Sequence, residues 1–351
     1  MGRPAGLIRA GFPYVRTIGD FHRTQFPLDV AVGKEGRLYV LCGNHGPITV
    51  MDIDGNDLGS FGDPAQGYRL PTIKGTTPTS CDVPEGFVGP VSMTADENEN
   101  LFISDEHCHR VAVYSRDGRF LNRWGVHGTG DGEFDRPSGL AFDLDQNLYV
   151  VDALNHRVQK FTIDGRFLGA WGTHGNGPGQ FDMPWGIALD ELGDIYVADW
   201  RNDRVQKFDS DMKFLFAIGT PGDGDGEFHR PSGVAVDKDG DIYVCDWGNS
   251  RVQLFAPDGR FVQKFNGDAT LSSTTLARMK TQNKRFKRLR ESGSIDLEKL
   301  FGRPRSVRVD EEGHMFVADF ECARVQIYKK EVYPLDDDDI ASPLRSPTLV
   351  N

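Results

Sequence analysis

Short runs of alternating apolar and polar residues recur along most of the chain, and each run is bounded by Gly, Asp or Asn. Within residues 136–172 the runs are Gly139–Phe142, Leu148–Val151, Arg157–Phe161 and Arg166–Trp171. Alternation with a period of two predicts half-buried strands, and helical periodicity is absent from this stretch. The pattern therefore predicts four short strands joined by polar turns such as Asp164-Gly165.

The same unit is repeated along the chain. Pro90, Pro137, Pro184 and Pro231 each follow the previous proline by 47 residues, and weaker copies begin at Phe26-Pro27 and Arg303-Pro304. Four-stranded units repeated at this length are typical of propeller blades. We expect six blades, near residues 26–62, 89–125, 136–172, 183–219, 230–267 and 303–330.

The two ends of the repeat region predict how the ring closes. The sixth copy ends after its third strand, Arg324–Tyr328, whereas Tyr14–Gly19 aligns with the fourth strand Phe167–Gly172. An N-terminal strand that completes the last blade would pair an otherwise open strand edge. Residues 1–13 are then an N-terminal extension, and the acidic segment 331–351 is expected to be a disordered tail.

The repeated residues resemble NHL repeats. The blade opening Arg136-Pro-Ser-Gly-Leu-Ala-Phe-Asp143, the middle Ile195-Tyr-Val-Ala-Asp199 and the later Asn202-Asp-Arg-Val-Gln-Lys-Phe208 carry the likeness, which covers roughly residues 14–330. Blade 1 departs from it, because Cys42 replaces the Asp and Ile48 stands where Arg is expected. The resemblance implies an all-β, six-bladed propeller of four-stranded NHL-type blades, and a fold of this kind hosts many functions.

An Asp and an Arg recur five residues apart in five blades. We interpret these pairs as charge-assisted hydrogen bonds that fix the turn between the second and third strands, because they recur blade after blade. The alternative is a ring of acid–base groups. The pairs are Asp105/Arg110, Asp152/Arg157, Asp199/Arg204, Asp246/Arg251 and Asp319/Arg324.

Two insertions interrupt the repeat, at residues 63–88 and 268–302. Both fall between a fourth strand and the next first strand. In a propeller these loops share one face with the loops between second and third strands, and we call this the top face. Irregular additions to a rigid scaffold often carry function. The sequence leaves open whether they cover the central channel.

The second insertion is predicted to be helical, because Leu276, Met279, Phe286 and Leu289 follow helical spacing after a capping Thr. It is strongly basic. One interpretation is an RNA- or phosphate-binding helix, and the other is a solvated face lying on an acidic propeller. The basic residues are Arg278, Lys280, Lys284, Arg285, Lys287, Arg288 and Arg290.

The charge balance and the cysteines limit the choice of partner and compartment. The chain carries 40 basic and 52 acidic residues, a net charge of −12, which disfavours a general electrostatic attraction to nucleic acid or membrane. Five cysteines without C-x-x-C spacing favour a reducing compartment, and no disulfide is needed for a core of this size. With no signal-peptide pattern or membrane span visible, we expect a soluble, cytoplasmic protein.

Repeat positions identify the residues at the channel mouth. Those that follow the blade-opening prolines or the strand-ending Asp residues include several aromatic rings and an arginine in blades 4 to 6. They suit a flat or anionic ligand or a peptide, although aromatic rings also wedge blades together. The ligand-binding candidates are Trp185, Trp200, Arg201, Trp247, Arg305 and Phe320.

Metal chemistry has one candidate segment, the blade 2 loop Glu106-His107-Cys108-His109. His107 and His109 alternate, so both side chains can face one way on an extended segment; a plain solvent-facing loop is the alternative. His127 and His174 occupy equivalent positions in later top-face loops. The zinc-binding histidines of NHL-type amidating lyases are absent from the corresponding positions here. No cofactor is identified, and a divalent metal stays possible without a strong motif.

Three functions follow from these features. The first is a non-catalytic propeller that binds a protein, peptide or small anionic ligand on its top face. The second is a lyase or hydrolase at the channel mouth, with Glu106, His107 and Arg305 as acid, base and anion-holding groups. The third is single-stranded RNA binding through the basic insertion and the aromatic rings.

Overall fold

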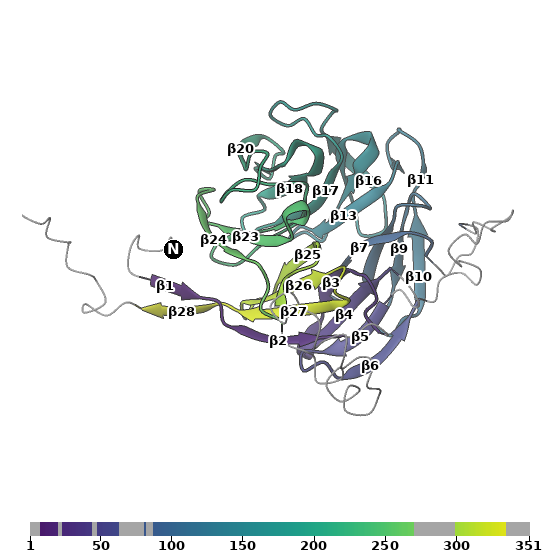
Figure 1. The fold of residues 1–351 in the computed structure, drawn as a ribbon. Helices are drawn as coiled ribbons and strands as arrows, with labels where there is room; N and C mark the ends of the chain where they lie inside the picture. The colour runs from purple at the N-terminus through teal and green to yellow at the C-terminus, as the bar shows by residue number, and fades with distance from the viewer. Residues whose placement is uncertain are drawn as a thin grey trace, which may run out of the picture.

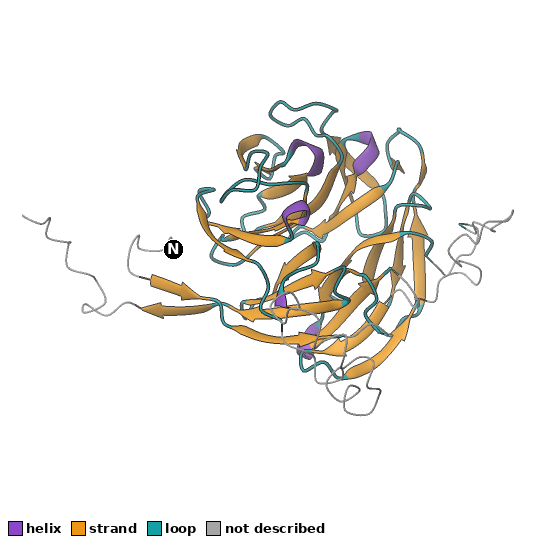
Figure 2. Cartoon of the chain, viewed as in Figure 1, coloured by secondary structure: helices purple, strands orange, loops and turns teal. Residues whose placement is uncertain are grey.

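Six four-stranded antiparallel sheets stand in a ring around a central channel in the computed structural model of the chain (Figure 1). The structure describes residues 8–19, 23–43, 48–62, 81, 87–269 and 299–334. Strands form almost all of the regular structure (Figure 2). The six-bladed propeller expected from the repeat is confirmed.

The blades follow one another along the chain, each running outward from the channel. Blade 1 contains β3 (Pro27–Val32), β4 (Arg37–Cys42), β5 (Ile48–Asp52) and β6 (Asp57–Phe61). Blade 2 contains β7 (Pro90–Ala95), β8 (Leu101–Asp105), β9 (Arg110–Tyr114) and β10 (Phe120–Trp124). Blade 3 contains β13 (Pro137–Phe142), β14 (Leu148–Asp152), β15 (Arg157–Phe161) and β16 (Phe167–Trp171).

Blades 4 and 5 repeat this arrangement. Blade 4 contains β17 (Pro184–Leu189), β18 (Ile195–Asp199), β19 (Arg204–Phe208) and β20 (Phe214–Ile218). Blade 5 contains β21 (Pro231–Val236), β22 (Ile242–Asp246), β23 (Arg251–Phe255) and β24 (Phe261–Phe265). Between blades 2 and 3, the short strands β11 (Val126–His127) and β12 (Glu133–Phe134) pair in parallel.

Blade 6 is built from both ends of the repeat region. Its inner strands are β25 (Pro304–Val309), β26 (His314–Asp319) and β27 (Arg324–Lys329), and β2 (Tyr14–Ile18) supplies the fourth strand. Ile18 pairs with Val325 and Tyr14 with Tyr328 in antiparallel register. The predicted closure of the ring by the N-terminal strand is therefore confirmed.

A two-stranded ribbon projects beyond blade 6 (Figure 1). It pairs β1 (Ile8–Gly11) with β28 (Glu331–Pro334) in antiparallel register. The segments predicted as N-terminal extension and disordered tail thus each contribute a strand. The rest of the tail, residues 335–351, lies outside the described residues.

The core lies between neighbouring blades, as the alternation of the strands requires. Six apolar clusters each combine two adjacent blades; one packs Phe102 and Val111 of blade 2 against Leu140 and Phe161 of blade 3. The cluster that joins blades 6 and 1 includes Ile18, so β2 contributes to the core as well as to the sheet.

Four short 3-10 helices occur within the described ranges (Figure 2). Three follow the second strands of blades 3 to 5: η2 (Ala153–Asn155), η3 (Trp200–Asn202) and η4 (Trp247–Asn249). The fourth, η1 (Lys34–Gly36), lies in blade 1. The helix predicted in the second insertion falls within residues 270–298, outside the described residues, so the structure gives it no support.

Candidate functional site

The first strands of the blades line a pocket in the central channel. The pocket holds about 340 Å³ of empty space when the adjoining open solvent is included, so little of that volume is enclosed. Its lining includes Leu28, Val91, Trp185, Ser232 and Arg305, which are residues that follow the blade-opening prolines. The repeat positions proposed for the channel mouth are therefore at the pocket.

Part of the channel wall is packed too closely for side chains. A Cβ atom on Gly139 would lie 2.5 Å from the carbonyl oxygen of Trp185, and one on Gly186 would lie 2.5 Å from that of Ser232. Ser138 Oγ donates a hydrogen bond to the same Trp185 oxygen at 3.0 Å. The first strands of blades 3 to 5 therefore form a tight glycine-lined wall, which leaves little depth for a ligand.

Asp29 and Arg308 form an ion pair that joins the first strands of the neighbouring blades 1 and 6 at the channel. Arg308 donates to both carboxylate oxygens of Asp29, with N–O distances of 3.1 and 2.6 Å. Blade 2 joins the pair, because Ser92 Oγ and the backbone N–H of Met93 donate to Asp29 at 2.7 and 3.0 Å. Asp29 is buried and its charge is fully paired, so we interpret this ion pair as a structural link between blades 1, 2 and 6. Sequence reasoning passed over it, because neither residue recurs in other blades.

A row of three tryptophans lies on the top face beside the pocket. Trp185 is the second residue of β17, whereas Trp200 and Trp247 are the first residues of η3 and η4. The ring centroids of Trp185 and Trp200 are 6.4 Å apart, as are those of Trp200 and Trp247. All three side chains are half-buried. The structure brings these predicted ligand-binding residues together.

Arginines lie against the rings of this row. The guanidinium of Arg305 is 5.2 Å from the ring centroid of Trp185 and 5.5 Å from that of Phe320. Arg230 covers Trp200 and Arg303 covers Trp247, both at 4.7 Å. Cation–π contact holds a guanidinium in place without using its N–H groups. Arg303 Nη1 also lies 3.3 Å from Glu321 Oε1, so this guanidinium has a carboxylate partner already. We call Trp185, Trp200, Trp247, Phe320, Arg230, Arg303 and Arg305 the tryptophan–arginine platform.

Two of these arginines were missed in the sequence, although a signal was present. Arg230 and Arg303 are the residues just before the blade-opening prolines, and both have positive φ. Both belong to an Arg-Pro dipeptide, which also opens blade 3. Arg201, predicted for the site, is exposed, and its Nη1 lies 3.9 Å from Asp182 Oδ1.

The surroundings of Arg305 combine burial with negative charge. Burial lowers the pKa of Arg305, and the carboxylates of Glu106 and Asp29 oppose that shift. An arginine stays protonated in any protein environment. Arg305 is therefore a permanent cation at the mouth, with Glu106 close enough to influence it.

The repeated Asp–Arg pairs are structural, as expected. In blade 5, Asp246 accepts hydrogen bonds from Arg251 at 2.7 Å, Asn249 at 2.9 Å and the backbone N–H of His229 at 2.8 Å. Blades 3, 4 and 6 repeat the Asp–Arg contact at 2.8, 2.9 and 2.6 Å. In blade 2 the pair is looser, at 3.9 Å.

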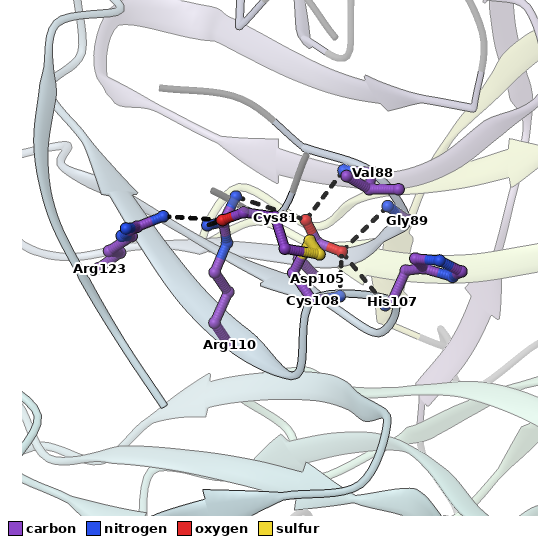
Figure 3. The surroundings of a disulfide bond; sticks show 8 residues. All are labelled: Cys81, Val88, Gly89, Asp105, His107, Cys108, Arg110 and Arg123. Carbon is purple, nitrogen blue, oxygen red and sulfur yellow. Dashed lines mark hydrogen bonds and ion pairs between the residues drawn. A yellow bond between two sulfur atoms is a disulfide. The ribbon is translucent and has the colours of Figure 1, made fainter. Parts of the chain in front are cut away.

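A disulfide bond between Cys81 and Cys108 occupies the blade 2 loop (Figure 3). Asp105 accepts backbone N–H bonds from both sides of it, including Val88 at 2.9 Å and Cys108 at 3.1 Å. Arg110 and Arg123 donate to the carbonyl oxygen of Cys81 at 2.9 and 3.1 Å. The disulfide thus ties the first insertion to blade 2.

This disulfide corrects the expectation drawn from the cysteines. The spacing of 27 residues between Cys81 and Cys108 gave no paired motif. Disulfides are typical of oxidising compartments, so the bond weighs against the cytoplasmic location, which stays a prediction. Among the described residues, no helix has the length and apolar character to cross a membrane.

The predicted metal candidates separate in the structure. Cys108 is oxidised, and the ring of His107 points away from the disulfide on an exposed side chain (Figure 3). His109 instead lies beside His127, with ring centroids 4.3 Å apart, and its Nδ1 is 3.6 Å from Asp135. Burial and the neighbouring His127 lower the pKa of His109.

The same arrangement occurs one blade further on. His156 and His174 have ring centroids 4.4 Å apart, and His156 Nδ1 is 3.7 Å from Asp182. Burial and His174 lower the pKa of His156. His127 and His174 were noticed in the sequence, but Asp135 and Asp182 were not, although each precedes a blade-opening proline by two residues.

The seven basic residues predicted for the second insertion lie between 278 and 290, outside the described residues. The same holds for residues 63–80 and 82–86 of the first insertion. The described part of the site is therefore the pocket, the tryptophan–arginine platform and the loops beside them.

Comparison with known proteins agrees with this architecture. The NHL repeat family matches residues 181–208 and 228–255, and a family described as 6-bladed beta-propeller matches residues 79–169. This chain is an NHL-repeat propeller. No curated protein matches the sequence of this NHL propeller.

Solved structures share the fold at low sequence identity. A streptogramin B lyase is 10% identical with a TM-score of 0.54, and the match covers 93% of this chain and 98% of that one. A virginiamycin B lyase from Staphylococcus aureus is 10% identical with a TM-score of 0.53, covering 94% and 89%. A protein of unknown function from Bacteroides thetaiotaomicron is 17% identical with a TM-score of 0.59, covering 92% and 76%. At these identities the similarity of the NHL propeller to each structure concerns the fold.

Proposed function

We propose that this NHL propeller is a non-catalytic module that binds a protein, a peptide or a small anionic ligand on its top face. The observation that carries the proposal is the tryptophan–arginine platform. The chemistry shared by these ligands is a planar or apolar group next to a negative charge. The aromatic rings would contact the planar or apolar group, and Arg230, Arg303 and Arg305 would bind the negative charge.

Part of the tryptophan–arginine platform is accessible to solvent. Arg230 and Arg303 are exposed, and the three tryptophans keep part of their surface in contact with solvent. Aromatic and arginine side chains dominate the binding energy of many interfaces because they bury large areas at little entropic cost. A surface with this composition supports ligand capture better than a purely structural role.

The arrangement of the polar groups favours binding over catalysis. Glu106 and Arg305 are within electrostatic reach of each other, but His107 points away from its neighbours (Figure 3). A general base has to reach the reacting group, and the His107 side chain extends away from Asp105 and the disulfide (Figure 3). The alternative, a lyase or hydrolase at the channel mouth under the two insertions, keeps Glu106, His107 and Arg305 as its candidates.

Single-stranded RNA binding is the second alternative, through the basic insertion together with the platform rings. The net charge of −12 opposes it, because RNA affinity rests on many phosphate contacts. Such binding would fall steeply as salt is raised, whereas a ligand held by one or two arginines would respond weakly. Salt dependence therefore separates the two ideas.

The test is a titration monitored by tryptophan fluorescence, because three of the five tryptophans lie in the platform. The probes are an acidic tyrosine-containing peptide, inorganic phosphate and a single-stranded oligouridylate. We expect the peptide to bind, and Arg305→Ala or Trp200→Ala to weaken binding about tenfold, roughly 1.4 kcal/mol. Arg166→Ala, an exposed arginine in the turn between the third and fourth strands of blade 3, is the matched control.

Two results would count against the proposal. Equal affinity in the wild type and the platform variants would place the binding site elsewhere. Preferential binding of oligouridylate with a steep salt dependence would favour the RNA alternative.

A further inference from the structure

Two sets of His, His and Asp side chains lie on the top face at neighbouring blade junctions. The first consists of His109, His127 and Asp135, between blades 2 and 3. The second consists of His156, His174 and Asp182, between blades 3 and 4. In each set, one ligand atom from every residue lies within 4.8 Å of the other two.

The distances suit a transition-metal ion. His109 Nδ1 and His127 Nε2 are 3.6 and 3.8 Å from the same oxygen of Asp135. In the second set the corresponding distances are 3.7 and 3.9 Å. Around a tetrahedral Zn²⁺, ligand atoms at about 2.0–2.1 Å from the metal lie about 3.3 Å from one another. The His–Asp distances exceed that value by a few tenths of an ångström, and the two imidazole nitrogens of each set lie within 4.8 Å of each other.

The hydrogen bonding of Asp182 points in the same direction. Its Oδ1 is buried and has no hydrogen-bond partner among the described residues, although Arg201 lies 3.9 Å away. Buried carboxylate oxygens are normally paired. Here the oxygen lies 3.7 and 3.9 Å from two imidazole nitrogens, so three potential metal-ligand atoms lie together.

The first histidine of each set shares a backbone contact with its counterpart at the next blade junction. His109 and His156 also accept a backbone N–H, from Arg136 at 3.2 Å and from Met183 at 3.1 Å. At the next junction Asp203 accepts the equivalent N–H, from Arg230 at 2.6 Å. At that junction, Pro221 and His229 stand in place of the second His and the Asp. The backbone hydrogen bond therefore forms without a complete set of His, His and Asp.

We propose that these two sets are equivalent binding sites for a divalent transition metal of the Zn²⁺ class. Each site supplies two imidazole nitrogens and one carboxylate oxygen, a donor set that leaves a fourth position for water. His127 and His174 are about two-thirds exposed, at 66% and 67%, which gives the ion a route from solvent. Binding through Nδ1 displaces the N–H of Arg136 and of Met183, because a neutral imidazole has one free lone pair.

The test is calorimetric titration of Zn²⁺ into the chelator-treated full chain. It uses a Cys322→Ser background, because Cys322 is the partly exposed free cysteine among the described residues. We expect two ions per chain and a higher melting temperature with the metal. His127→Ala should lose one ion, His174→Ala the other, and the double variant both. These two side chains are exposed, so the variants are expected to fold.

A matched control and an independent readout make the result decisive. His229→Ala removes an exposed histidine from the junction that lacks the set, and should still bind two ions. Hydrogen exchange at the amides of Arg136 and Met183 should become faster when Zn²⁺ is bound. No binding at micromolar metal would overturn the proposal, as would two ions retained in the double variant.

Discussion

A single buried carboxylate organises the top of each regular blade. In blade 5, Asp246 joins the segment before β21, the helix η4 and the strand β23, because it accepts hydrogen bonds from all three. Burial raises the pKa of Asp246, and the partners that surround it counteract that shift. The sequence predicted these Asp–Arg pairs as structural elements, and it could do so because they recur at the same spacing.

Replacing Asp246 tests this at the residue scale. Asp246→Asn leaves Arg251 with a buried charge and no partner carboxylate, so we expect the free energy of unfolding to fall by about 3 kcal/mol. Denaturation in guanidinium chloride gives the value. Asp131→Asn, at an exposed position of a top-face loop, is the control and should change stability little. Equal stability of the two variants would contradict the role assigned to Asp246.

Lys330 is a second residue on which several strands depend. Its ammonium group contacts Asp237, Asp239 and Asp241 in the first turn of blade 5, the latter two at 2.7 and 2.8 Å. The residue follows β27, so the contact joins blades 5 and 6. Sequence reasoning did not find it, because Lys160 and Lys207 meet the equivalent turns from within their own blades.

The variant Lys330→Met leaves three carboxylates facing an apolar side chain. We expect a loss of about 3–5 kcal/mol at neutral pH. Burial lowers the pKa of Lys330, but the three carboxylates outweigh it and the net shift is upward. Because the pKa of Lys330 is raised in the folded protein, its ion pairs stabilise the fold fully below the unfolded-state pKa of 10.5. This stabilisation is lost as the pH rises through the folded-state pKa. Wild type and variant should therefore converge in stability in strong alkali, whereas a constant difference across pH would argue against the ion cluster.

At the scale of elements, the strand pattern was readable from sequence while the additions to it were not. The alternation of apolar and polar residues and the 47-residue spacing were sufficient to predict the blades, because every blade repeats the same pattern of buried and exposed positions. The strand β28 and the disulfide partner Cys81 lie outside the repeat. They have no counterpart in another blade from which they could be predicted. The platform was partly predictable, since its aromatic residues and Arg305 were identified, whereas Arg230 and Arg303 lie in the Arg-Pro motif that opens the blades.

Strand β2 gives a prediction at this scale. Deleting residues 1–19 removes it and leaves β27 as an open edge, so we expect loss of cooperative unfolding and a tendency to aggregate. Deleting residues 1–11 removes β1 alone and is the matched control, with β2 and a cooperative transition retained. Thermal melting and size-exclusion chromatography distinguish the two. An unchanged melting temperature in the longer deletion would show that β2 does not hold the ring closed.

At the scale of the whole molecule, a disulfide and an ion pair that do not belong to the repeat link parts of blades 6, 1 and 2. The Asp29–Arg308 bridge joins these three blades inside the channel, and the Cys81–Cys108 bond fastens the first insertion to blade 2. Blades 3 to 5 have the regular repeat and the glycine-lined wall instead. The irregular part of the ring thus has links that the repeat does not supply, whereas blades 3 to 5 are held by packing and by the repeated Asp–Arg pairs.

Removing the disulfide measures how much that cross-link contributes. For a separation of 27 residues, the loss of loop entropy in the unfolded chain is worth about 3–4 kcal/mol. We expect Cys81→Ser to lower the free energy of unfolding by up to this amount, and a reductant to have the same effect on the wild type. Cys322→Ser controls for the loss of a thiol. A wild type insensitive to reductant would contradict the stabilising role of the bond.

The closure of blade 6 has a consequence for synthesis of the chain. Strand β2 is made first and β27 roughly 300 residues later, so at about 5–20 residues per second β2 waits roughly 15–60 s for its partner. During that time blades 1 to 5 can fold on the ribosome, whereas the pairing of β2 with β27 in blade 6 cannot form. Newly made molecules therefore pass through an open-ring stage with two exposed strand edges, and protection of those edges during translation governs the yield of folded protein.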